Sequence, residues 1–405
     1  MAPNPHRHRW WMLGSLWTLY ASFGLVAGSL APLLERVRVD LGMSRSAIGA
    51  ALGAWPFVYL FVAIGAGKVL DRVGLRWGLV LGIVGIAGSA FGRAVAQGPL
   101  SLWLAVALFG LGGPFISVGA PKLVAEWFDE SARGRAVGIY STASSSGAVV
   151  ALAAAGPLRS GLGSWRWVLV LFGVVAVVAG IGWARVARVR APTTTTIPES
   201  RPALGLLADH SVRWVMVMAI GVFFLGHAIG GWMPEMLRTS GWSETGAGLV
   251  MAAGVGCGIV GSILLPAMIP PERRGLVMSL LLVLLAVVLW PLLGEARLAH
   301  AAVAPVIGTA RVLLVPMAML ILMSTPVVTP ARMGAAGGLF FTAGEIGGVS
   351  GPWLVGIARD ADDDFSLAIT ILSMVALALL IAVRGATRGR LPSAHARAVP
   401  DSRPH

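Results

Sequence analysis

Twelve apolar stretches, each long enough to cross a lipid bilayer, dominate this sequence. A helix needs about 20 apolar residues to cross about 30 Å of hydrocarbon. Because 57% of the residues are hydrophobic and only 12% are charged, the chain has too little polar surface for a soluble domain. We therefore predict an all-α membrane protein with twelve transmembrane helices, over residues 10–33, 46–67, 76–96, 101–124, 134–157, 165–188, 212–235, 244–268, 274–293, 302–326, 332–357 and 365–384.

A polar segment near the middle of the chain separates these stretches into two groups of six. Residues 185–209 contain three prolines and four consecutive threonines and show no apolar period, a composition typical of a linker. The sequence therefore predicts an N-terminal half over 1–188, a cytoplasmic linker over 189–211, a C-terminal half over 212–384 and a disordered cytoplasmic tail over 385–405.

A weak internal repeat relates the two halves. Four features of the first half recur in the second at offsets between 195 and 199 residues, namely Gly110 with Gly308, Arg135 with Arg332, Gly138 with Gly337, and Gly156-Pro157 with Gly351-Pro352. A common offset on both sides of a linker favours duplication. We therefore predict two pseudo-symmetric six-helix bundles.

The distribution of basic residues predicts the orientation. With both termini in the cytoplasm, 21 of the 31 Lys and Arg residues fall on the cytoplasmic side and nine outside, whereas the acidic residues divide evenly. This bias in Lys and Arg alone is what the positive-inside rule describes. The first apolar stretch has no convincing small-residue cleavage site, so we interpret it as an uncleaved first helix and not as a signal peptide. We expect a multi-pass protein of the bacterial inner membrane whose termini are both cytoplasmic.

Several function classes are disfavoured. The single cysteine, Cys257, offers no disulfide framework and no thiolate metal site. The net charge of +13 comes almost entirely from Arg in short loops, which indicates cytoplasmic loops and not nucleic-acid binding. We find no phosphate-binding loop, no metal-ligand spacing and no nucleophile with a base. The sequence therefore predicts a monomeric membrane protein that is no enzyme and has no cofactor and no metal.

The most specific motif lies between the second and third apolar stretches. It reads Gly67-Lys-Val-Leu-Asp71-Arg72-Val-Gly74-Leu-Arg76, a tight turn in which Asp71 can meet Arg72, Arg76 or a helix N-terminus. It resembles the loop signature Gly-x-x-x-Asp-Arg-x-Gly-Arg-Arg of the major facilitator superfamily, in which this loop latches the two halves together on the cytoplasmic side. The resemblance implies that Gly67, Asp71, Arg72, Gly74 and Arg76 form a cytoplasmic gate.

Other stretches extend this resemblance over nearly the whole chain, with departures. Residues 127–138 resemble the family's link from helix four to helix five, residues 163–167 its entry to helix six, and residues 344–352 its helix eleven. The Arg that proton-driven drug exporters of the family carry four residues before a helix-four Gly is replaced here by Val106, which disfavours multidrug export. The counterpart loop Pro270–Arg274 has no Asp, so we expect a stronger latch in the first half.

Three ionisable residues fall inside the predicted membrane helices. At 1.5 Å per residue, Arg311, Glu345 and His227 lie roughly 10 Å below the outer surface, all in the second half. A charge at the bilayer centre costs about 2.5–3.5 kcal/mol on insertion scales, so such residues face partners or water. Either Arg311 and Glu345 form a structural pair, or Arg311 faces the cavity and binds an anion through its planar fork. His227 is either a proton-coupling group or a bonded core residue.

Aromatic residues of the middle helix segments complete the predicted site. Trp17, Tyr20, Tyr59 and Phe223 can form its apolar wall, although packing and lipid contact explain such residues equally well. The resemblance implies that the cavity is lined by helices one, four, seven and ten, which include the helix of Arg311.

The function predicted from the sequence is secondary transport by alternating access around a site near the midplane. The favoured substrate is a small organic or inorganic anion, with a coupling proton or an exchanged anion as a second partner. The chain resembles most the carriers of oxalate and formate, cyanate, and nitrate and nitrite. Efflux of drugs or hydrophobic compounds is the alternative transport function, and a non-transporting membrane receptor or sensor is the alternative from another class.

Overall fold

The computed structural model describes residues 5–187, 203–329, 332–362 and 364–387. Every regular element within these ranges is a helix. The predicted tail and most of the predicted linker lie outside them, and the end of the linker forms η2 (Ala203–Ala208).

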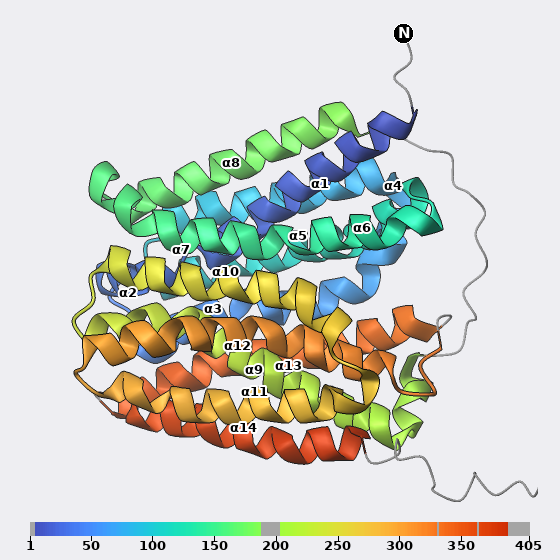
Figure 1. The fold of residues 1–405 in the computed structure, drawn as a ribbon. Helices are drawn as coiled ribbons and strands as arrows, with labels where there is room; N and C mark the ends of the chain where they lie inside the picture. The colour runs from blue at the N-terminus through green and yellow to red at the C-terminus, as the bar shows by residue number, and fades with distance from the viewer. Residues whose placement is uncertain (1–4, 188–202, 330–331, 363, 388–405) are drawn as a thin grey trace, which may run out of the picture.

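The helices of the first part of the chain occupy the upper layers of Figure 1. They are α1 (Pro5–Gly28), η1 (Ala31–Leu33), α2 (Leu34–Asp40), α3 (Arg45–Leu52), α4 (Ala54–Ala94), α5 (Pro99–Trp127), α6 (Glu130–Ser141), α7 (Ala143–Leu162) and α8 (Trp165–Val186). The predicted fifth span is divided into α6 and α7. Ser44 caps α3, because its Oγ accepts a hydrogen bond from the N–H of Ala47 at 3.1 Å.

Most helices of the second part lie below them in the same view, where α3 reaches down to their level. They are α9 (His210–Thr239), α10 (Glu244–Met268), η3 (Pro271–Arg273), α11 (Arg274–Val288), η4 (Trp290–Leu293), α12 (Arg297–Met323), α13 (Met333–Ala361) and α14 (Ser366–Thr387). The predicted tenth span begins earlier than expected, at Arg297. The basic residues do not interrupt it, because His300 is buried and contacts the carbonyl of Pro291 at 3.1 Å.

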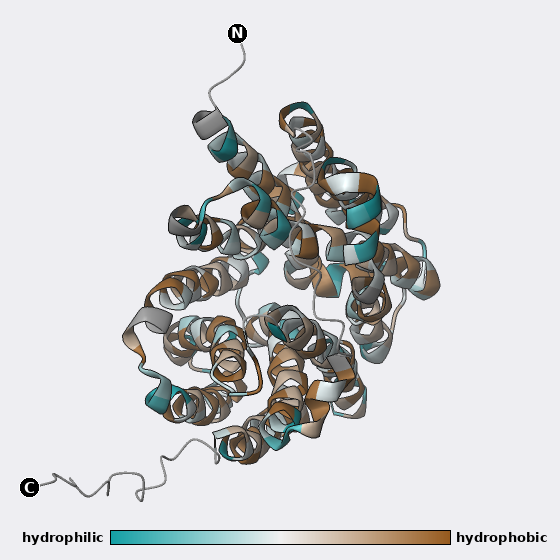
Figure 2. Cartoon of the chain, turned by 90° about the vertical axis from the view of Figure 1, so that its right-hand side faces the viewer, coloured by the Kyte–Doolittle hydropathy of each residue, from teal (hydrophilic) through white to brown (hydrophobic). Residues whose placement is uncertain are grey.

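Eleven helical segments of the described chain are long and apolar enough to cross a membrane. Helix α13 is not among them, although it has 29 residues. Its many glycines and Glu345 lower its mean hydropathy, and much of it is packed against α9 and α3. Figure 2, seen from the end where the chain passes from α8 to α9, shows hydrophobic residues along the helices and hydrophilic residues gathered near helix ends.

A single glycine turns the chain within α4. Gly74 has φ +78° and ψ 157°, a left-handed conformation that glycine adopts without a steric penalty. Both arms of α4 return to the same part of α5, since Gly110 packs against Trp55 of the first arm and Gly112 against Gly85 of the second. The predicted tight turn between the second and third spans is therefore a one-residue break.

The two parts of the chain repeat one helix crossing. A Cβ on Gly147 of α7 would stand 1.8 Å from the carbonyl oxygen of Ala21 of α1, and a Cβ on Gly347 of α13 would stand 1.8 Å from that of Ile220 of α9. Only glycine permits such close approach of two backbones. The paired positions are separated by 199 and 200 residues, close to the offsets of the sequence repeat.

Polar contacts join the two parts of the chain at one end of the bundle, called here the α2 end. The carboxylate of Asp360, on α13, accepts hydrogen bonds from the backbone N–H groups of Arg45 at 2.9 Å and Ser46 at 2.8 Å. It therefore caps the N-terminus of α3 from the other half of the molecule. Close beside it, a Cβ on Gly49 would stand 2.4 Å from the carbonyl oxygen of Pro352.

A second junction at the α2 end is ionic. Glu244, at the start of α10, has a side chain that is 8% exposed and lies 2.8 Å from Nε of Arg159 on α7. Arg36 of α2 approaches the same carboxylate at 3.9 Å. One acidic side chain of the second half thus bridges two helices of the first.

The opposite end, called here the linker end because α8 ends and α9 begins there, is more open. Sites for a Cβ on Gly134 and Gly138 of α6, and on Gly334 and Gly338 of α13, have no neighbouring heavy atom within 4 Å. Phe341 of α13 is 41% exposed. The halves therefore approach each other closely at the α2 end and leave α6 and α13 open at the linker end.

Candidate functional site

A cavity of about 330 Å³ lies between the two halves. Its walls come from α1, α3, α4 and α7 of the first half and from α9, α10, α12 and α13 of the second. A site shared by both halves is what a rocking transporter requires, because its walls move apart when the halves rotate.

Small residues create this space in the first half. Gly24, Ala27, Gly28 and Ala31 lie at intervals of three or four residues on α1 and η1, so they share one face. Gly24 packs directly on the backbone of Ser144 in α7. The part of the first-half wall that α1, η1 and the start of α7 form is therefore made of glycine, alanine and serine, whereas Leu52, Trp55 and Leu152 add larger side chains.

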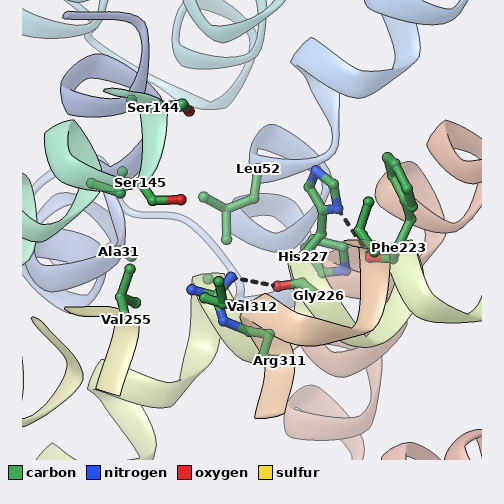
Figure 3. Close-up of a pocket in the computed structure, with 18 of the residues that line it drawn as sticks. Ala31, Leu52, Ser144, Ser145, Phe223, Gly226, His227, Val255, Arg311 and Val312 are labelled. Atoms are coloured by element: carbon green, nitrogen blue, oxygen red, sulfur yellow. Dashed lines mark hydrogen bonds between the residues drawn. The ribbon is translucent and has the colours of Figure 1, made fainter. Parts of the chain in front are cut away.

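Arg311 is the one permanently charged side chain among the described residues that line the cavity. It lies in α12, and its Nη1 donates to the carbonyl oxygen of Gly226 on α9 at 3.1 Å (Figure 3). Its buried Nε has no hydrogen-bond partner among the described residues. The guanidinium thus has donor capacity for a ligand.

His227 also lines the cavity, one residue after the carbonyl that Arg311 contacts. Its Nδ1 lies 3.0 Å from the carbonyl oxygen of Phe223. Its ring stacks near Phe223 at 5.8 Å and lies 5.2 Å from the ring of Trp55 on α4. The imidazole is therefore held between the two halves.

Glu345 lies beside His227. The alternative in which Arg311 and Glu345 form a structural pair would require Glu345 to lie beside Arg311 instead. Its Oε2 lies 3.9 Å from His227 Nε2, and its side chain is 5% exposed. Arg311 approaches α9 at Gly226, and residue 227 points about 100° farther around that helix. Arg311 and Glu345 thus approach different sides of α9.

The other predicted wall residues fall into three positions. Phe223 lines the cavity. Tyr59 lies behind Trp55, with its hydroxyl 2.5 Å from Ser117 Oγ. Trp17 and Tyr20 are not among the cavity-lining residues, since Trp17 donates to Thr142 at 3.1 Å and Tyr20 stacks on Tyr140.

The predicted gate residues make contacts within their own half in this conformation. Asp71, 71% exposed, forms an ion pair with Lys122 of α5, not with Arg72 or Arg76. Arg76 donates to the carbonyl of Ala184 in α8 at 2.7 Å. Arg72 is exposed, and Gly67 packs loosely on α5. The motif, including the Gly74 break, thus organises the linker end of the first half.

Sequence reasoning missed part of the site. Trp55, Ser144 and Ser145 line the cavity, and Figure 3 shows both serines on the side of it away from Arg311. Three consecutive serines in an apolar span were the available signal.

A buried arginine of the first half was also missed. Arg93, near the end of the predicted third span, is 1% exposed, donates to the carbonyl oxygen of Val26 at 2.8 Å and lies over the ring of Phe109. Arg93 is thus more deeply buried than Arg311, which is half-buried, and it is not among the residues that line the cavity.

No group of three or more His, Cys, Asp or Glu residues that could hold a metal occurs in the described ranges.

Comparisons with known proteins agree with this architecture. A family model described as Major Facilitator Superfamily matches residues 16–352. Over 401 residues the chain is 24% identical to the uncharacterized transporter YycB of Bacillus subtilis (strain 168), covering 96% of this chain and 97% of that protein. A crystal structure of a bacterial homologue of the human lysosomal transporter Spinster shares the fold, with a TM-score of 0.70, 15% identity and 96% of each chain covered.

Shorter similarities concern two further relatives. The chain is 27% identical to the D-galactonate transporter of Escherichia coli O6:H1 over 191 residues, covering 46% of this chain and 43% of that one. It is 32% identical to the puromycin resistance protein pur8 of Streptomyces alboniger over 183 residues, covering 44% and 36%. The chain matches less than half the length of each of these two proteins.

Proposed function

We propose that this chain, which belongs to the Major Facilitator Superfamily, moves a small organic anion across the membrane by alternating access. It is a multi-pass membrane transporter and not an enzyme. The proposal concerns the substrate, the direction in which the site faces and the residues that bind.

The proposed architecture has twelve membrane spans in two six-helix bundles. Helix α13 is the twelfth span, since its 29 residues are long enough to cross the hydrocarbon. The matching crossings at Gly147 and Gly347 support bundles of equivalent construction. The bundles correspond to residues 1–188 and 212–384.

The proposed conformation faces the cytoplasm. The linker end carries the basic excess of the sequence, so the positive-inside rule assigns that end to the cytoplasm and places both termini there. Asp360 and Glu244 join the halves at the α2 end, whereas α6 and α13 are open at the linker end. Rocking the halves would separate the α2-end contacts and bring the motif around Asp71 toward the second half.

The observation that carries the anion proposal is Arg311. A guanidinium inside a membrane protein is costly unless it is paired, and here it contacts one carbonyl and keeps a buried Nε without a partner. A carboxylate could accept two parallel hydrogen bonds from it. Ser144 and Ser145, on the opposite wall, offer hydroxyls to the remainder of the same solute.

The favoured anion is a sugar-acid-like carboxylate that carries hydroxyl groups. The similarity to the D-galactonate transporter supports this class, as does a cavity of about 330 Å³ with one cationic wall and one serine wall. The resemblance to carriers of oxalate and formate, cyanate, and nitrate and nitrite stays a prediction that the same test addresses.

Drug efflux is the second candidate, favoured by the similarity to the puromycin resistance protein. The aromatic surfaces of Trp55 and Phe223 could hold an apolar ring. Anion transport requires Arg311 for substrate binding, whereas drug efflux does not.

Ligand-induced thermal stabilisation of the purified protein separates the candidates. We would test D-galactonate, oxalate, formate, nitrate and puromycin on the wild type and on Arg311→Gln. A ligand at 100 times its Kd stabilises the folded state by about 2.7 kcal/mol. The anion proposal requires that a carboxylate stabilises the wild type and not the variant. If puromycin alone stabilises both the wild type and Arg311→Gln, drug efflux is favoured. If none of these ligands stabilises the wild type, a non-transporting sensor is favoured.

A further inference from the structure

Glu345 is a buried carboxylate without a hydrogen-bond partner for one of its oxygens. Its side chain is 5% exposed, and Oε2 accepts no hydrogen bond from any described residue. Gly348, one turn farther along α13, leaves room for it, because a Cβ there would stand 2.6 Å from Oε2 and 3.3 Å from Cε1 of His227. The backbone thus forms a recess that holds the carboxylate next to the imidazole.

The hydrogen bond on the other side of His227 determines what its Nε2 can do. The carbonyl oxygen of Phe223 only accepts hydrogen bonds, so Nδ1, 3.0 Å away, carries the hydrogen. In the neutral ring, Nε2 then has a free lone pair, directed at the recess and 3.9 Å from Glu345 Oε2. A proton from water can therefore reach Nε2 from the cavity, which His227 lines, and can be shared with the buried Oε2 of Glu345.

Few other titratable groups face this pair. Arg311 of α12 acts on His227 electrostatically, and Tyr59 of α4 is close enough to Glu345 to feel its charge. Tyr20 of α1 interacts electrostatically with Tyr59, and the α4 residues nearest the pair, Trp55 and Pro56, are uncharged. Tyrosine hydroxyls are uncharged near neutral pH. The local charge is therefore set by Arg311, His227 and Glu345.

Counting these charges relates the proton to the anion. With Glu345 ionised and His227 neutral, the three groups sum to zero, and one added proton makes the sum +1. A monoanion is attracted to the second state, and the loaded site is then neutral again. Only the empty site and the fully loaded site are neutral, and closing the linker end around a net charge would incur a desolvation penalty.

We propose that Glu345 and His227 form one shared proton-binding site beside Arg311, so that one proton and one monoanion are carried together. This coupling rests on the proposed anion transport, which supplies the identity of the second transported species, the monoanion. His227, which lines the cavity, is the point of exchange with water, and Glu345, behind it, keeps the proton out of solvent. The expected reaction is electroneutral symport.

The proton site can be tested without any substrate, through Trp55. The centres of the Trp55 and His227 rings are 5.2 Å apart. A proton on the imidazole therefore places a positive charge close to the indole, where it changes the electric field at the ring. Because the chain has 15 Trp residues, the signal is the fluorescence of each protein minus that of the same protein with Trp55→Phe. We expect a pH transition whose midpoint moves by at least about one unit in Glu345→Gln. Absence of a Trp55-dependent transition, or the same midpoint in both proteins, would overturn the shared site.

The coupling is tested with D-galactonate as the probe. If one proton binds with each anion, the apparent Kd of the full-length protein should rise about tenfold per pH unit above the midpoint. Glu345→Gln, a neutral isostere, should bind about as tightly as the protonated wild type at every pH above the midpoint of its own His227 transition. Glu235→Gln is the matched control, because Glu235 is a largely buried carboxylate of α9 that pairs with Arg238 at 3.6 Å. It should keep the wild-type slope.

The outcomes separate this inference from the proposed function. A wild-type Kd that is independent of pH, or a Glu345→Gln variant that keeps the slope, would overturn the coupling. If D-galactonate does not bind at any pH, sugar-acid transport fails, while a Glu345-dependent Trp55 transition would still establish the proton site.

Discussion

Gly230 makes room for the guanidinium of Arg311. A Cβ at position 230 of α9 would stand 2.7 Å from Nη1 of Arg311 and 3.3 Å from its Cζ. The same nitrogen donates to the carbonyl of Gly226, one turn earlier. Two glycines one turn apart thus form a notch on α9 that sets how far Arg311 reaches into the cavity.

Filling this notch should displace the arginine without unfolding the protein. In Gly230→Ala the methyl group meets the far end of a flexible side chain, which can move aside at little cost. We expect weaker anion binding with a nearly unchanged Tm, as judged by anion titration and thermal unfolding of the same sample. Gly182→Ala, on α8 with open space around it, should alter neither. Unchanged affinity in Gly230→Ala would show that the position of the guanidinium is not critical.

Replacement of Arg311 should distinguish charge from geometry. Arg311→Lys keeps the charge but loses the planar fork, so we expect the affinity for a carboxylate to fall about tenfold or more, since a hydrogen bond to a charged group contributes about 1.5–3 kcal/mol. Arg311→Gln should abolish binding. Isothermal titration of both variants checks this, and equal affinities of Lys and Gln variants would argue against an ionic contact.

Breaking the Glu244 junction should open the α2 end. Loss of a hydrogen bond to a charged group costs about 1.5–3 kcal/mol, and every 1.4 kcal/mol changes an equilibrium tenfold. In a Cys257→Ser background, Ala148→Cys reports on the cavity, which Ala148 lines. We expect Glu244→Gln to increase its labelling from outside by an impermeant maleimide at least about tenfold. The exposed Glu272→Gln should not, and equal labelling in both would exclude Glu244 as a closing contact.

The Asp71–Lys122 pair should matter for rate and not for stability. Asp71 is 71% exposed, and exposed ion pairs contribute about 0–1 kcal/mol. We therefore expect Asp71→Asn to insert and unfold like the wild type while transporting more slowly, because the cytoplasmic closure loses a charge. Uptake into proteoliposomes and thermal unfolding measure the two properties separately. If Asp71→Asn takes up substrate at the wild-type rate, the motif around Asp71 does not act as a gate and contributes only to the membrane topology.

The orientation can be tested by reporter fusions. Fusions at Thr195 and after Arg388 should both report the cytoplasm, and a fusion near Asp363 should report the outside, because 21 of the 31 basic residues lie on the predicted cytoplasmic side. A periplasmic signal at Thr195 would contradict the arrangement of two six-helix halves.

The membrane architecture was largely accessible from the sequence because it depends on local composition. Helix lengths follow from the thickness of the hydrocarbon, and the turn at Gly74 follows from a residue that tolerates positive φ. Helix α13 shows the limit of such reasoning, since its glycines lower its hydropathy below that of a typical span while permitting the contact of Gly347 with Ile220.

The sequence by itself determined the membrane class, most of the helices and the family resemblance, and it predicted a common depth for the three ionisable groups. Only the tertiary structure decided their partners. Depth along a helix follows from counting residues, but the direction of a side chain around the axis, and the helix it then faces, depends on packing. Glu345 therefore meets His227 while Arg311 faces the cavity from the Gly226–Gly230 notch. Trp55 completes the arrangement from the other half, a contact between segments far apart in the chain that no local pattern encodes.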